Sequence, residues 1–176
     1  MAEVGEVRVA AYVADGSLSA ESSYASTLRE LGADGNDLVL VALLTDEERS
    51  PGSADGPEGA DGADRGGRVV GTIMLQTWPN GGQVVSGPQE AEIRALAVSP
   101  EVRGRGVGAE LLRRLTERAA EMGIRELVLC TLPEMRAARR LYERAGFVRR
   151  PERDWSPVPG TELLVYDMRL DASSPQ

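Results

Sequence analysis

Short apolar runs bounded by turn-forming residues predict the β-strands of this chain. The first candidate runs from Val7 to Val13 and ends at Asp15-Gly16. Further strands are predicted at Asp37–Leu44, Arg68–Trp78, Glu90–Val98 and Glu126–Thr131. Two last segments, Phe147–Trp155 and Leu163–Leu170, are expected to close the fold as an antiparallel pair.

Three other segments repeat their apolar residues with the period of an α-helix. In the segment that ends at Gly123, the residues at i, i+4, i+8 and i+11 from Leu111 share one apolar face. Met135–Ala145 carries a second apolar stripe, and Ser19–Leu31 is predicted to be amphipathic with Ser19 as its N-cap. Strands joined by turns and then a strand–helix–strand–helix unit predict an α/β (α+β) fold, a mixed sheet with helices on both faces.

Between two predicted strands lies an acidic stretch, residues 45–68, that is rich in glycine and proline and nearly free of large apolar residues. Such a composition cannot bury enough surface to order itself. We interpret it as a flexible insertion in a single domain spanning residues 1–171, because strand patterns resume on both sides. A partner-binding tail is the alternative. Residues 172–176 are expected to form a frayed tail.

The composition, with 41% hydrophobic and 27% charged residues, is that of an ordinary globular protein. No apolar run approaches the roughly 20 residues of a membrane helix, and no signal-peptide pattern opens the chain. A single cysteine, Cys130, fits a reducing cytoplasm and is interpreted as core packing. The chain has no histidine, which excludes histidine triads and imidazole metal ligands, so we predict no metal site.

Charge is spread unevenly along the chain, whose formal net charge is −8. An acidic protein is a poor candidate for binding nucleic acid. Residues 101–150, however, carry twelve arginines and seven glutamates. This basic stretch favours a polyanionic cofactor there, although solvated helix faces laced with Glu and Arg are the simpler reading.

The most informative motif is Arg103-Gly104-Arg105-Gly106-Val107-Gly108, which lies between a predicted strand and a predicted helix. Glycines at such a junction let several backbone N–H groups converge at the positive end of the helix dipole, which suits a pyrophosphate. A plain strand–helix turn is the simpler alternative. A dinucleotide fingerprint is a second one, but the next strand ends at Cys130-Thr131 without the acidic residue that it requires.

This motif is followed by a second one, Ala138–Phe147, with Leu141-Tyr142 and Gly146-Phe147 at its centre and end. Together they resemble the Gcn5-related N-acetyltransferase (GNAT) superfamily, whose acyl-CoA signature Arg/Gln-x-x-Gly-x-Gly/Ala is matched by Arg103, Gly106 and Gly108. The resemblance covers the second half of the chain well. It implies the GNAT fold, with a mostly antiparallel sheet, splayed central strands and acetyl-CoA as cosubstrate.

The resemblance also implies which residues hold the cosubstrate. In the family, the strand before the glycine loop pairs its backbone with the pantetheine arm of CoA. The cofactor-binding residues expected here are Leu96, Ala97 and Val98 on that strand and Arg103, Gly104, Arg105, Gly106, Val107, Gly108 and Ala109 in the loop.

Two residues are expected by resemblance to be catalytic. Tyr142 matches the tyrosine near the CoA sulfur, where a phenol can protonate the leaving thiolate. Glu92 lies where many family members place a general base. The alternatives are core packing for Tyr142 and an exposed ion pair with Arg94 for Glu92. Met135 departs from the family pattern, which often has an asparagine there, so that contact is lost or replaced.

The sequence therefore predicts a cytoplasmic acyltransferase that moves an acetyl group from acetyl-CoA to an amine. The chain has no histidine that could activate a nucleophile to form a covalent intermediate. Direct attack of the amine on the thioester in a ternary complex is therefore favoured. The acceptor is expected to be a small-molecule or peptide amine; neither nucleic acid nor a membrane is expected as a partner, and a homodimer is compatible with the sequence. A non-catalytic acyl-CoA sensor is the alternative function.

Overall fold

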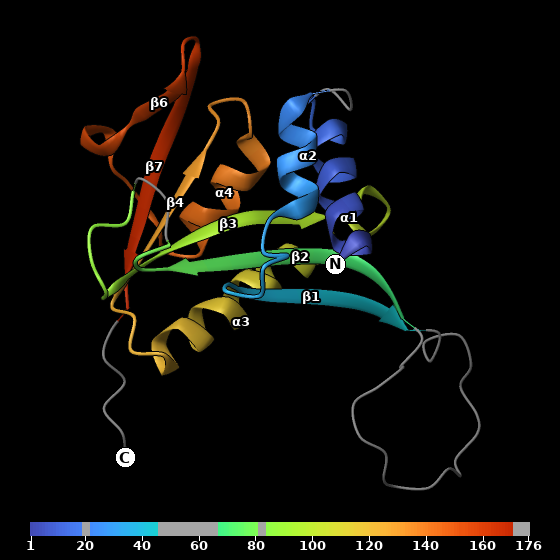
Figure 1. Ribbon diagram of the computed structural model, residues 1–176, viewed down its shortest axis with the longest axis horizontal. Helices are drawn as coiled ribbons and strands as arrows, with labels where there is room; N and C mark the ends of the chain where they lie inside the picture. The colour runs from blue at the N-terminus through green and yellow to red at the C-terminus, as the bar shows by residue number, and fades with distance from the viewer. Residues whose placement is uncertain (19–21, 46–66, 81–83, 171–176) are drawn as a thin grey trace, which may run out of the picture.

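A computed structural model describes residues 1–18, 22–45, 67–80 and 84–170 of the chain (Figure 1). One sheet organises the fold, with strand order β1-β2-β3-β4-β7-β5 and β6 paired to β7. The helices are α1 (Ala2–Ala14), α2 (Ser23–Glu30), α3 (Val107–Glu121) and α4 (Arg136–Arg144). The strands are β1 (Leu38–Thr45), β2 (Gly67–Thr77), β3 (Glu90–Val98), β4 (Glu126–Thr131), β5 (Val148–Arg149), β6 (Trp155–Val158) and β7 (Thr161–Arg169).

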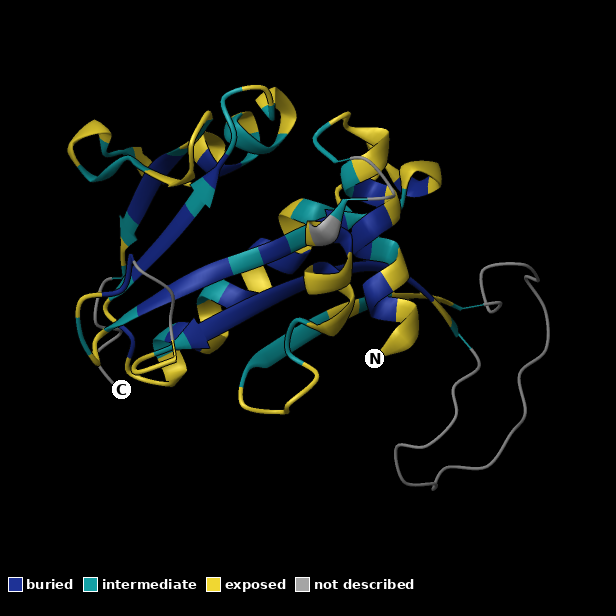
Figure 2. Ribbon diagram, turned by 45° about the horizontal axis from the view of Figure 1, so that its top comes forward, coloured by how far each residue is buried: buried dark blue, intermediate teal, exposed yellow. Residues whose placement is uncertain are grey.

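Only β3 and β4 run parallel; every other described pair of neighbouring strands is antiparallel. The sheet is therefore mixed and mostly antiparallel, as the sequence predicts. Figure 1 shows α1 and α2 on one face of the β1–β3 half and α3 on the other. Leu112 and Leu115 of α3 are almost fully buried in the main apolar cluster, which also holds Ile73 of β2. Figure 2 shows the resulting band of buried residues along the middle strands.

Glu90–Val98 and Glu126–Thr131 have the bounds that the apolar runs predict. Thr45 at the end of β1 pairs with Gly67 at the start of β2, so the chain between them joins two neighbouring strands. The predicted insertion lies almost wholly in residues 46–66, outside the described residues. The predicted tail, 172–176, and the predicted N-cap Ser19 lie outside them as well.

The predicted strand at Val7–Val13 is wrong, because this segment belongs to helix α1. The buried residues Gly5, Arg8 and Val9 recur at helical spacing. Counting a glycine and an arginine as polar positions hides this period and leaves an apparent apolar run. Packing against α2 explains the glycine, because a Cβ on Gly5 would lie 2.8 Å from the Cα of Arg29. The two helices thus approach too closely for any larger residue.

Arg8 is fully buried and its guanidinium caps the end of α2. Its Nη1 donates hydrogen bonds to the carbonyl oxygens of Leu28, at 3.3 Å, and Leu31, at 2.6 Å. These carbonyls have no partner in the helix ladder, and a cation is favourable at the negative end of the helix dipole. Burial lowers the pKa of Arg8. The helix pair α1–α2 is thus held by an arginine in a segment where the sequence predicts a strand.

Two further boundaries differ from the sequence prediction. Helix α2 begins at Ser23, and Ser22 is its N-cap, accepting a hydrogen bond from the Tyr24 N–H at 3.2 Å. The predicted strand Phe147–Trp155 holds only the two residues of β5, a 3₁₀ turn that opens at Pro151, and the first residue of β6. Proline has no N–H to continue the ladder, which explains the interruption. Both pieces still pair antiparallel with β7.

Candidate functional site

The middle of the sheet opens where β3 and β4 part. Their parallel pairing runs only from Glu90–Glu126 to Ile93–Leu129. Beyond this point β3 continues beside β2 as far as Val98, and β4 continues beside β7 as far as Thr131. We call the space between the two diverging strand ends the wedge. The expected splay of the central strands is therefore present in the described sheet.

A bulge in β3 accompanies the parting. The register with β2 shifts between Thr72 and Met74, so that β3 has one residue more than its partner there. Ala95 lies at this bulge with φ = 51°, a left-handed conformation that is uncommon for a residue other than glycine. Such strain is often found at functional sites. The bulge turns the backbone of Leu96, Ala97 and Val98, which no β4 residue pairs with, along one wall of the wedge.

The glycine loop follows β3 after a short 3₁₀ turn, Pro100–Val102. Gly104 and Gly106 have φ of 78° and 81°, and a Cβ on either would meet open space. Conformation, not packing, therefore calls for glycine at these two positions. Gly106 is the N-cap of α3, and the first α3 backbone hydrogen bond runs from Glu110 N–H to Gly106 O at 3.0 Å. The N–H groups of Val107, Gly108 and Ala109 precede it and have no carbonyl within the helix.

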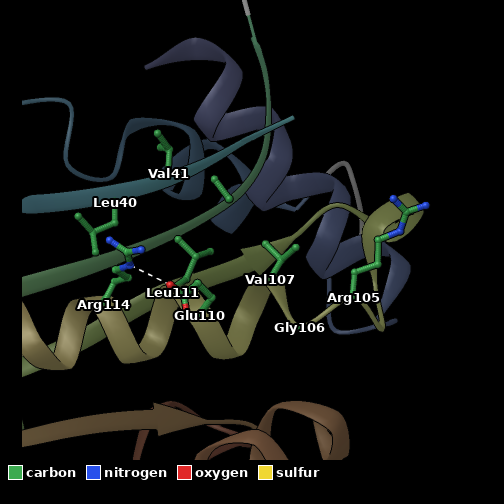
Figure 3. A pocket seen from close by; sticks show the side chains of 9 residues that line it. Leu40, Val41, Arg105, Gly106, Val107, Glu110, Leu111 and Arg114 are labelled. Carbon is green, nitrogen blue, oxygen red and sulfur yellow. Dashed lines mark hydrogen bonds and ion pairs between the residues drawn. The ribbon is translucent and has the colours of Figure 1, made fainter. Parts of the chain in front are cut away.

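The two arginines of the loop point to different places. The Arg103 guanidinium reaches α1, where Nη2 donates to the Ala11 carbonyl oxygen at 3.0 Å and Nη1 lies 2.9 Å from Asp15. The Arg105 side chain extends away from α3 into the open (Figure 3). Arg103 thus ties the glycine loop to the last turn of α1, and the exposed Arg105 is the loop arginine that faces solvent.

A cavity of about 510 Å³ lies between β1 and the start of α3 (Figure 3). Its walls include Leu40 and Val41 of β1 and Gly106, Glu110 and Arg114. Arg113 and then Arg114 hold the pKa of Glu110 down at about 2 through hydrogen bonds. The glutamate charge at the helix start is thereby offset by two arginines. Arg105 and Val107 also line this cavity, whereas neither Tyr142 nor Glu92 does.

Tyr142 lies on α4 with only 7% of its surface exposed. Its ring packs edge-on against Phe147, with 6.0 Å between centroids. Burial raises the pKa of Tyr142, so that its phenol stays protonated at neutral pH. Burial also raises the pKa of Tyr12 on α1, and the neighbouring phenols of Tyr142 and Tyr24 raise it further. The last turn of α1 and helix α4 therefore bring two phenols together beside the wedge.

Glu92 is a buried carboxylate on β3, just before the strands part, with 7% of its surface exposed. Its strand position is level with Gln76 of β2 and Val128 of β4. The Arg94 guanidinium lies 3.8 Å from it and donates a 2.9 Å hydrogen bond to Gln76 Oε1. The expected Glu92–Arg94 pair is present, but on a largely buried sheet face and not at an exposed edge.

Cys130 is a neighbour of Glu92 and fits the interpretation as a packing residue. It lies against an apolar cluster that includes Val128 and Val165. Burial raises its pKa to about 11, opposed by a 3.5 Å hydrogen bond from the Trp155 indole N–H to Cys130 Sγ. At neutral pH the group is a thiol, which is a weak nucleophile.

A basic groove on α4 was not anticipated from the sequence. A cavity of about 200 Å³ is lined by Arg136, Arg139, Arg140 and Glu143. Arg139 donates to the Tyr166 hydroxyl at 3.2 Å and to the Pro133 carbonyl at 3.1 Å. The spacing i, i+3, i+4 places the three arginines on one helix face, a signal that was visible in the sequence.

Two classes of site find no support in the described residues. No group of three or more His, Cys, Asp or Glu side chains within them is placed to hold a metal ion. None of the helices that they form is long and apolar enough to cross a bilayer.

Known proteins resemble the chain in sequence. The acetyltransferase (GNAT) family pattern matches residues 32–147. A probable glucosamine 6-phosphate N-acetyltransferase 2 from Oryza sativa subsp. japonica is 30% identical over 148 residues, which cover 82% of this chain and 69% of that protein. A mycothiol acetyltransferase from Cellulomonas flavigena is 30% identical over 58% of this chain, which spans only 32% of its length.

Solved structures resemble it in fold. An acetyltransferase of the GNAT family from Staphylococcus aureus Mu50 superposes with a TM-score of 0.65 over 96% of this chain and 92% of that one, at 16% identity. A putative GNAT acetyltransferase from Desulfovibrio desulfuricans gives the same TM-score at 17% identity, over 96% of this chain and 94% of that one. At these identities the likeness concerns the fold alone.

Proposed function

Because the chain belongs to the acetyltransferase (GNAT) family, we propose that it transfers an acetyl group from acetyl-CoA to an amine, and that the wedge is where the transfer occurs. The observation that carries this proposal is the junction of the parted strands with the glycine loop. A flat, elongated cosubstrate with a pyrophosphate needs both a strand edge and an anion cradle. Here β3 provides the strand edge and leads, through a short 3₁₀ turn, into the glycine loop.

The residues present fit such a cosubstrate. The N–H groups of Val107, Gly108 and Ala109 have no helical partner and suit the pyrophosphate oxygens, aided by the helix dipole. The exposed Arg105 adds a cation for the same group. The free backbone edge of Leu96–Val98 suits the amides of the pantetheine arm, which would lie beside it as an additional strand. The basic groove on α4 offers a second surface for phosphate.

The catalytic roles that we assign follow the family resemblance of Glu92 and Tyr142. Bound acetyl-CoA supplies a thioester whose carbonyl carbon accepts the amine. Glu92 takes a proton from the amine as the C–N bond forms. Tyr142 donates its phenolic proton to the sulfur as the C–S bond breaks. The Tyr142 phenol, whose pKa burial raises further, is protonated at neutral pH and can supply this second proton.

The names of the relatives suggest where to begin with the acceptor. One is named for glucosamine 6-phosphate, whose amine is primary and sits beside hydroxyl groups. We propose a primary amine on a polar small molecule as the acceptor class. A peptide amine, which the sequence also leaves open, is the alternative within the same reaction.

The test is a panel of acceptors, with release of free CoA followed by a thiol reagent. The panel contains glucosamine 6-phosphate, amino acids, polyamines and peptides, and mass spectrometry identifies an acetylated product. We expect one amine class to release CoA well above the rate without acceptor. CoA binding without turnover across a broad panel would instead support a non-catalytic acyl-CoA sensor.

A further inference from the structure

Arg94 is a solvent-accessible cation beside the proposed base. It lies on β3 one residue beyond the last pair with β4, which joins Ile93 to Leu129. Its side chain is 30% exposed, whereas that of Glu92 is 9% exposed. Alternation along β3 places Arg94 and Glu92 on one face of the strand. Ile93 lies on the other face, in the apolar cluster that α3 covers.

A row of hydrogen bonds across the sheet holds the Arg94 side chain in place. Asp37 stands directly before β1, and its Oδ2 accepts a 3.0 Å hydrogen bond from Gln76 Nε2 of β2. This bond fixes the orientation of the Gln76 amide, so that Oε1 is left for Arg94. Arg94 Nη1 donates to that oxygen at 2.9 Å. The guanidinium is therefore positioned by an amide whose own direction is set.

The row leaves most of the guanidinium unused. A guanidinium has five N–H donors, and the bond to Gln76 is the one hydrogen bond that Arg94 makes within the described residues. Its 3.8 Å separation from Glu92 is too long for a hydrogen bond. Burial raises the pKa values of Tyr12 and Cys130, and the Arg94 charge opposes both shifts. Arg94 thus lies near α1 and β4 as well, and both of these neighbours are neutral.

The Arg94 charge restricts which amines suit this site. A free aliphatic amine is mainly a cation at neutral pH, and its charge is repelled by a guanidinium nearby. A carboxylate or phosphate on the same molecule turns this repulsion into attraction, because a guanidinium binds such groups through paired N–H donors. Glu92 and Arg94 lie 3.8 Å apart, which suits an amine and an anion separated by a few bonds.

We propose that Arg94 is a specificity-determining residue that binds a carboxylate or phosphate group on the amine acceptor. The acceptor class named above is thereby narrowed to amines that carry an anion close to the nitrogen. The role of Glu92 as base rests on the proposed function; the unused donors of Arg94 and the row that holds them do not. Gln76 is a positioning residue in this arrangement. The competing role for Arg94 is to balance the charge of Glu92.

The experiment uses two pairs of amines that differ in one anionic group. Alanine with alaninamide tests a carboxylate, and phosphoethanolamine with ethanolamine tests a phosphate. The proteins are the unaltered chain, Arg94→Gln, Arg94→Lys and a control, Arg118→Gln. Arg118 pairs with Glu121 on the exposed face of α3, so the control removes the same charge elsewhere. For each amine, kcat/KM is measured with acetyl-CoA, and Kd is measured by calorimetry in the presence of CoA.

The unaltered chain should prefer the anionic member of at least one pair by roughly 10-fold or more, the value of a charge-assisted hydrogen bond. Arg94→Gln should lose this preference, because it slows the reaction of the anionic member. The rate with the other member should stay the same or rise, since the repulsion is removed as well. Arg94→Lys should recover part of the preference, because it keeps the charge without the fork. Arg118→Gln should keep the preference, and all four proteins should bind CoA alike.

An equal loss with both members of a pair in Arg94→Gln would overturn the proposal, because Arg94 would then serve Glu92 alone. A preference of the unaltered chain for the non-anionic members, or a loss of CoA affinity in Arg94→Gln, would also overturn it. If no amine is acetylated, the proposed function fails instead. Binding of an anionic member that weakens in Arg94→Gln would then still support the role of Arg94, and no binding of any member would overturn it.

Discussion

The two walls of the wedge differ in chemistry although they belong to one sheet. The β3 side is charged: Arg94 lies just beyond the last β3–β4 pair and forms an ion pair with Glu92, and the strand leads to Arg105 in the glycine loop. The wall formed by β4 and α4 presents uncharged hydroxyls, those of Thr131 and Tyr142, in apolar surroundings.

This difference shows how one site can both bind charged groups and donate a proton from a neutral group. The phosphates of the cosubstrate need a cation or exposed N–H groups, and the amine needs a base that takes its proton. A leaving thiolate requires a neutral proton donor, and a tyrosine phenol is neutral at pH 7. Burial raises the pKa of Tyr142 further. Glu92 is level with Val128, whereas Thr131 alternates with Leu129, so the charged and the neutral side chains lie on opposite faces of the sheet. Predictions about each wall therefore differ in kind and in size.

The largest effect is expected on the neutral wall. Tyr142→Phe keeps the ring that packs against Phe147 and removes only the phenolic proton. We expect kcat to fall by about 100-fold, the lower range of general-acid catalysis, with acetyl-CoA affinity intact. Steady-state kinetics and a binding titration on the same preparation measure both. A variant with full kcat would leave Tyr142 as a packing residue.

A smaller and pH-dependent effect is expected on the charged wall. Glu92→Gln keeps the shape and removes the base, so kcat should fall by roughly 10-fold or more near neutral pH. The defect should shrink as the pH rises, because the amine then loses its proton to solvent. The Tyr142→Phe defect should persist over the same range. A pH-independent loss in Glu92→Gln would assign this residue to acceptor binding.

The smallest effect separates the two loop arginines. Arg105→Gln should weaken acetyl-CoA binding by about 5-fold, since a solvent-facing cation near phosphate is lost. Arg103→Gln should change that affinity by less than about 2-fold, because its guanidinium is engaged with Ala11 and Asp15. Calorimetric titrations of the two variants give the contrast. Equal losses would show that Arg103 leaves α1 to bind phosphate.

The second half of the chain is largely predictable because its signals are local. The predicted strands Glu90–Val98 and Glu126–Thr131 are short and bounded by turns, and both have those bounds in the structure. Gly104 and Gly106 of the loop have positive φ, a conformation that favours glycine. The family resemblance adds what no local pattern contains, the parting of β3 from β4.

The first half is harder because its buried residues are not apolar. Arg8 and Gly5 lie on the buried stripe of α1 for reasons that exist only once α2 is in place. The error there concealed Tyr12, which belongs to α1 and lies near Tyr142. Arg94 was within a correctly predicted strand, yet its hydrogen bond to Gln76 is a property of the packed structure. The direction of the Arg103 side chain is likewise a tertiary contact.

The central claim is that the parted strands and the glycine loop together bind acetyl-CoA. A calorimetric titration of the unaltered chain with acetyl-CoA, beside an identical titration with NAD, tests it most directly. We expect saturable one-to-one binding of acetyl-CoA, a Tm that rises with its concentration, and no binding of NAD. Binding of NAD without binding of acetyl-CoA would contradict the account.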